Sequence, residues 1–66
     1  MVVWINGERR ELTAGATVPD ALGALGLPCT GVAVAVDGEV VPRAAWAGTA
    51  LVDGARVEVL TAVQGG

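Results

Sequence analysis

The 66-residue sequence contains no histidine and no lysine, and its only cysteine is Cys29. Without histidine, the chain lacks the side chain that most often binds transition metals or moves protons near neutral pH. A single cysteine cannot form an internal disulfide or a cysteine-based zinc site. No nucleophile and base can be paired from the side chains that remain, so we predict no catalytic residue and no bound metal.

Charge and hydropathy exclude further classes of function. Seven acidic residues against four arginines give a net charge of -3, so no basic surface for nucleic acid is expected. The longest apolar runs, such as Val32–Val36, are far shorter than the ~20 residues that span a bilayer. The first residues lack the basic start and long apolar stretch of a secretion signal. We therefore expect a small, acidic, single-domain, cytoplasmic protein that is monomeric on its own.

Two dipeptides mark tight turns between short strands. Asn6-Gly7 and Asp37-Gly38 both suit the type I′ hairpin turn, which needs positive φ at its two central residues. Each therefore predicts a β-hairpin. The strands that the two turns join are predicted over residues 2–5, 9–13, 32–36 and 40–41.

A helix is predicted between the two hairpins. Thr17 and Asp20 have the spacing of a capping box, in which each side chain satisfies a backbone N–H group of the first turn. Gly26 is placed for the left-handed residue that ends many helices. The apolar stripe that would face a sheet consists of Val18, Leu22 and Leu25.

The last strand is predicted over residues 56–63, after a helical turn near residues 42–46 and a tight turn at Asp53-Gly54. Alternation along this strand places Leu60 and Ala62 on its outer face. The order of elements predicts an α+β fold, a mixed sheet with one helix packed across it. An outer sheet face that stays partly apolar indicates a surface for a partner.

The two tryptophans are the only aromatic residues of the chain, and each can fill the core or anchor a partner. For Trp4 both possibilities stay open, whereas for Trp46 we favour packing. Cys29 follows a proline and has no histidine or lysine near it to activate the thiol, so we interpret it as incidental. The candidate partner interface therefore consists of Leu60, Ala62 and Trp4.

The sequence given ends with Gln64, Gly65 and Gly66. Because glycine has no Cβ, a Gly-Gly end can enter a narrow enzyme site with backbone conformations that other residues rarely adopt. The reactive group would then be the carboxylate of Gly66, which agrees with the lack of catalytic side chains. The dipeptide alone is also compatible with a frayed terminus or a cloning remnant.

The diglycine completes an ordered set of motifs that runs through the whole chain. The set consists of Asn6-Gly7-Glu8, Gly15-Ala16-Thr17-Val18, Ala33–Arg43, Trp46, Asp53–Val59 and Gly65-Gly66. In this order the chain resembles the ubiquitin-like β-grasp sulfur carriers, and within them the ThiS family of thiamine biosynthesis. The resemblance implies a β-grasp domain over residues 1–63 and a flexible diglycine tail over residues 64–66.

The resemblance also implies the chemistry and the partners. An adenylyltransferase of the ubiquitin-activating type (ThiF type) would use ATP to adenylate Gly66. Sulfur from a persulfide, supplied by way of a cysteine desulfurase, would then replace the adenylate and leave a thiocarboxylate. Thiazole synthase (ThiG type) would accept this sulfur for the thiazole ring of thiamine. The chain would be a protein cosubstrate without a cofactor of its own, and Gln64 and Gly65 would thread into the partners.

Three alternatives stay open at this point. The small sulfur-carrier subunit of molybdopterin synthase shares the fold and the diglycine, although such proteins are usually longer and more aromatic. A non-covalent β-grasp interaction module would use only its sheet face and would not need Gly65 and Gly66. A self-contained enzyme is disfavoured, because the chain offers no acid–base pair, nucleophile–base pair or metal site.

Overall fold

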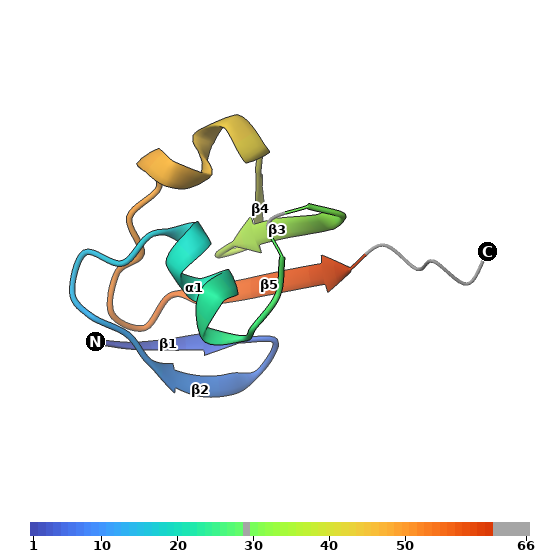
Figure 1. Ribbon diagram of the computed structural model, residues 1–66. Helices are drawn as coiled ribbons and strands as arrows, with labels where there is room; N and C mark the ends of the chain where they lie inside the picture. Colours follow the sequence, from blue (N-terminus) through green and yellow to red (C-terminus); the bar gives the residue numbers. More distant parts are fainter. Residues whose placement is uncertain (29, 62–66) are drawn as a thin grey trace.

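A computed structural model of the chain describes residues 1–28 and 30–61 (Figure 1). Five short strands and one α-helix follow one another in the predicted order, with a 3-10 helix before the last strand. The predictions for Cys29, Ala62, Gln64, Gly65 and Gly66 lie outside the described residues. The elements are β1 (Val2–Ile5), β2 (Glu8–Glu11), α1 (Val18–Ala24), β3 (Val32–Val36), β4 (Glu39–Val41), η1 (Arg43–Gly48) and β5 (Arg56–Thr61).

The strands form one mixed sheet in the order β2-β1-β5-β3-β4. The last strand of the chain is therefore the middle strand of the sheet. It runs parallel to β1, with Trp4 beside Arg56, and antiparallel to β3, with Val32 beside Thr61. Helix α1 lies across one face of this sheet, and η1 lies on the same side (Figure 1). The predicted mixed sheet with one helix packed across it is confirmed.

Both predicted hairpin turns have the expected geometry. The φ angles are 52° at Asn6 and 81° at Gly7, and 50° at Asp37 and 85° at Gly38, as a type I′ turn requires. The return strand of the first hairpin begins at Glu8 and not at the predicted residue 9, because the two-residue turn lets Glu8 pair directly with Ile5. The strand ends at Glu11, opposite Val2, although Leu12 and Met1 still exchange two backbone hydrogen bonds of 2.8 Å beyond it.

The two ends of α1 follow the predicted signals. At the start, the Thr17 backbone N–H donates to the Asp20 carboxylate at 2.8 Å, as in a capping box. At the end, Gly26 has a φ of 71°, and the Leu27 N–H donates to the Leu22 carbonyl at 3.0 Å. This is the Schellman motif, which satisfies carbonyls that the helix leaves free.

Within the described residues, no helix has both the length and the apolar character needed to cross a bilayer.

Gly23 lies inside α1 and Gly26 lies just after it, and we expect substitution by alanine to have opposite effects on stability at these two positions. Gly23 lies inside α1, and a Cβ added there meets nothing within 4 Å, so Gly23→Ala should stabilise the fold by about 0.5–1 kcal/mol. Gly26 has equal space but a left-handed backbone, so Gly26→Ala should destabilise the fold by about 1–2 kcal/mol. Urea unfolding of both variants measures the two changes. A loss of stability in both would contradict the assignment of Gly23 to the helix interior.

The core lies between the sheet and the side covered by α1 and η1. The helix contributes Val18, Ala21 and Leu22, all fully buried, while Leu25 is half-buried at its edge. Trp46 of η1 is buried as predicted, and its indole N–H donates to the Val41 carbonyl at 2.8 Å. The buried strand and loop residues that complete this core are Val3, Ile5, Val34, Leu51, Ala55, Val57 and Val59.

The described part of β5 has the predicted alternation. Val57 and Val59 point into the core, whereas Glu58 and Leu60 are exposed on the opposite face. The predicted strand extended to residue 63, and only its part up to Thr61 is described. The alternation therefore gives the sheet two faces of different character, one covered by the helix and one open.

Candidate functional site

The sheet face opposite α1 has no element packed on it among the described residues, and we call it the open face (Figure 1). The register of the strands determines which side chains lie on it, since paired residues share a face. Trp4 of β1 lies beside Arg56, and Ala33 of β3 lies beside Leu60. The open face comprises Val2, Trp4, Arg9, Glu11, Ala33, Ala35, Val40, Arg56, Glu58 and Leu60.

Three large apolar side chains of the open face are exposed. Leu60 is 71% exposed, Val40 is 76% exposed and Trp4 is 42% exposed. The alanines of β3 lie between Val40 and β5 and have small side chains, so the side chains of Leu60 and Val40 protrude from the surface. A small domain gains nothing for its own stability from large apolar groups in water, and three of them on one uncovered sheet face indicate contact with another molecule.

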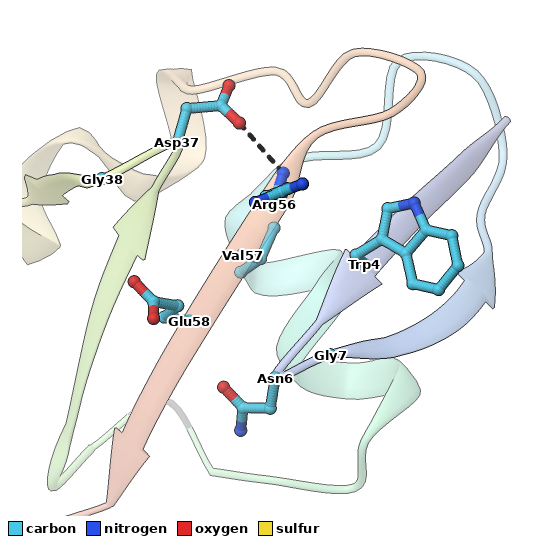
Figure 2. Close-up of a pocket in the computed structure, with 8 residues that line it drawn as sticks. All are labelled: Trp4, Asn6, Gly7, Asp37, Gly38, Arg56, Val57 and Glu58. Atoms are coloured by element: carbon cyan, nitrogen blue, oxygen red, sulfur yellow. Dashed lines mark hydrogen bonds between the residues drawn. The ribbon is translucent and has the colours of Figure 1, made fainter.

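The half of the open face near the two hairpin turns is charged and hollowed (Figure 2). A depression of about 830 Å³ lies between the turns, over the start of β5. Asp37, Arg56 and Glu58 line it together with Trp4, and of the three Arg56 is paired with Trp4. Among the described residues, no group of three acidic or cysteine side chains is placed to bind a metal ion. The hollow is therefore a charged region at the start of β5, apart from the apolar end of the open face around Leu60.

Two of the predicted interface residues, Leu60 and Trp4, lie on the same face of the sheet but are not neighbours on it. Leu60 lies on the open face, as alternation indicated, and Trp4, for which both possibilities had stayed open, lies on the same face and outside the core. Trp4 pairs with Arg56, four positions before Leu60, which places the two side chains roughly 13 Å apart along the strand. They therefore belong to opposite ends of the face. The other predicted site residues, Ala62, Gln64, Gly65 and Gly66, lie outside the described residues.

The structure adds two residues that the sequence analysis had not assigned to the site. Val40 had been described only as part of a return strand, and its exposure follows from its pairing with Ala35 at the sheet edge. Asn6 had been explained by its turn, yet its side chain reaches β5 and forms two hydrogen bonds with Val59. For Val40, alternation across the second hairpin was a usable signal. For Asn6, no signal existed, because the turn alone accounts for an asparagine.

A protein-family model described as the ThiS family matches residues 3–66 of the chain. A relative from Paramagnetospirillum magneticum, named thiazole synthase, is 39% identical over 66 residues. That match covers 100% of this chain and 20% of the relative, so the chain spans about a fifth of that protein's length.

Two solved structures are similar over the whole chain. The first is a crystal structure of a thiamine biosynthesis protein (ThiS) from Geobacter metallireducens, with a TM-score of 0.78 and 34% identity, covering 100% of both chains. The second is a solution structure of a thiamine biosynthesis protein from the same organism, with a TM-score of 0.79 and 32% identity, covering 88% of that chain. This agreement in structure confirms the predicted β-grasp architecture.

Proposed function

Because the chain belongs to the ThiS family, we propose that it is a sulfur carrier for thiazole formation and that its sulfur is carried on the carboxyl group of Gly66. The carboxylate attacks the α-phosphorus of ATP on a partner enzyme, which releases pyrophosphate and forms an acyl adenylate. A persulfide sulfur then displaces AMP from the carbonyl carbon. Cleavage of the remaining sulfur–sulfur bond by a thiol leaves a thiocarboxylate at Gly66, ready for the acceptor.

The observation that carries this proposal is the extent of the family match. It continues through Gly65 and Gly66 and does not stop with the folded domain. Two residues without Cβ suit an end that must enter a buried adenylation site. Five residues follow Thr61, so a fully extended chain would carry the Gly66 carboxylate at most about 18 Å beyond the sheet.

The partners follow from the same chemistry. A relative named thiazole synthase contains a segment similar to the whole of this chain, which supports thiazole synthase as the enzyme that accepts the sulfur. We assign adenylation to an adenylyltransferase of the ubiquitin-activating type and the supply of sulfur to a cysteine desulfurase. Both the adenylyltransferase and the synthase would dock on the open face, around Leu60, and take in the same end of the chain. Their binding is therefore mutually exclusive.

Intact mass spectrometry tests the carrier chemistry directly. The protein is incubated with the adenylyltransferase of its host, ATP, cysteine and the desulfurase. We expect a mass increase equal to the replacement of one oxygen by sulfur, and no increase in a variant that lacks Gly66. An unchanged mass with an adenylyltransferase that is active on another carrier would contradict the proposal and favour the non-covalent interaction module.

The acceptor is tested in a second step with the thiocarboxylated protein. We expect thiazole synthase to remove the sulfur and return the carrier to its original mass. Transfer to the large subunit of molybdopterin synthase, with none to thiazole synthase, would instead assign the chain to the alternative sulfur-carrier class.

A further inference from the structure

The side chain of Asn6 joins the first hairpin to the last strand. Its amide nitrogen donates to the Val59 carbonyl at 3.1 Å, and its amide oxygen accepts from the Val59 N–H at 2.8 Å. The two residues are 53 positions apart in the sequence. The side-chain amide thus offers β5 the same donor and acceptor that the backbone of a neighbouring strand would offer. This is more than a hairpin turn requires of its first residue.

The contact lies where the backbone pairing between β1 and β5 stops. The last paired residues are Ile5 and Val57, and the Asn6 N–H still donates to the Val57 carbonyl at 2.8 Å. Beyond this point the chain of the first hairpin turns away toward β2. On the other side of β5, pairing with β3 continues as far as Thr61. Within the described residues, the Asn6 side chain is therefore the last group that holds β5 from the β1 side.

We propose that Asn6 is a positioning residue for the carboxyl-terminal reaction: by holding the Val59 peptide unit, its side chain sets the direction in which the chain leaves the sheet. This inference rests on the proposed function, since it concerns the path toward Gly66. Val59 neighbours Leu60, so the same contact fixes the docking residue and the strand that leads to the reactive end. An enzyme that binds the open face would then meet Leu60 and the described end of β5, from which the chain leads to Gly66, in one fixed arrangement.

Asn6→Gly separates this role from the turn. Glycine adopts the φ of 52° that Asn6 needs without cost, so the turn is kept and only the two side-chain hydrogen bonds are lost. Asp37→Gly is the matched control. Asp37 holds the same position in the second type I′ turn, with a φ of 50°, and its carboxylate accepts from the Arg56 N–H at 3.0 Å. That contact holds the opposite end of β5, away from Gly66.

The decisive measurement is the rate constant of adenylation under single-turnover conditions at saturating adenylyltransferase. We expect Asn6→Gly to lower this rate constant by about tenfold or more, because a misplaced reacting group slows chemistry even when it is bound. Asp37→Gly should leave it unchanged. A purely structural effect would only lower the folded fraction, which raises the half-saturating concentration and leaves the rate constant at saturation as it was.

A second readout on the full chain does not depend on activity. Amide hydrogen exchange at Val59 should become at least tenfold faster in Asn6→Gly and stay unchanged in Asp37→Gly, since Asn6 accepts the Val59 N–H. Equal adenylation rate constants for Asn6→Gly and the unmodified protein would overturn the inference alone. Absence of adenylation in the unmodified protein would overturn the proposed function, and the inference with it.

Discussion

Replacing Leu22 with alanine is expected to cost about 2–5 kcal/mol of folding free energy. Leu22 is fully buried in the middle of α1, where it faces the sheet. A chain of 66 residues has a total stability of roughly 3–10 kcal/mol, so this one change removes a large share of it. Thermal unfolding should show a Tm lower by roughly 10–30 °C, and part of the protein should be unfolded at room temperature.

The chain offers a matched control for this prediction. Leu60→Ala makes the same chemical change at a site that is 71% exposed, so it removes almost no buried surface. Its effect on stability should stay within about 0.5 kcal/mol. Equal losses in the two variants would mean that α1 does not pack on the sheet through Leu22, contrary to the structure.

Replacing Leu60 with aspartate is expected to weaken binding of the adenylyltransferase by about tenfold or more, because the centre of an interface tolerates a charge poorly. Leu60 is the most exposed large apolar residue of β5 and lies nearest to the proposed reactive end. The fold should persist, since the side chain lies in water and a strand position of this kind costs at most about 1 kcal/mol. Titration calorimetry with the adenylyltransferase measures the affinity, and circular dichroism confirms the fold.

Val52→Asp is the control for Leu60→Asp, because it introduces the same charge outside the open face. Val52 is 64% exposed, close to the value for Leu60, but it lies in the loop between η1 and β5 and outside the sheet. We expect this variant to bind with unchanged affinity. If both aspartate variants bind normally, docking takes place elsewhere on the molecule. If both bind weakly, added negative charge, and not the loss of an apolar contact, explains the result.

Local sequence signals were enough to predict most of the fold because they act over a few residues. The Asn6-Gly7 turn, the capping box at Thr17 and the left-handed Gly26 each satisfy their own backbone groups, and all three are present as expected. The ends of the strands were predicted less accurately. β2 runs over Glu8–Glu11 and not over the predicted 9–13, because its register is set by pairing with β1, which its own residues do not encode.

The candidate site could be predicted only in part, for the same physical reason. Alternation placed Leu60 on the outer face of β5, and burial of its neighbours Val57 and Val59 bears this out. The contact between Asn6 and Val59 depends on two segments from opposite ends of the chain. Local pattern cannot indicate such a pair, so the residue that holds the end of β5 became visible only in three dimensions.

The central position of β5 has a consequence for synthesis of the protein. Among the described strands, the one that joins the two hairpins into one sheet is synthesised last, whereas its partner strand β1 is synthesised first. Until β5 is inserted, β1 and β3 each have an unpaired edge, and the core lacks Val57 and Val59. Folding of this sheet therefore waits until β5 has been synthesised, as is typical of folds with distant strand pairs. A polypeptide that stops short of β5 would have neither a joined sheet nor a docking face, so β5 must be synthesised before partners can recognise the domain.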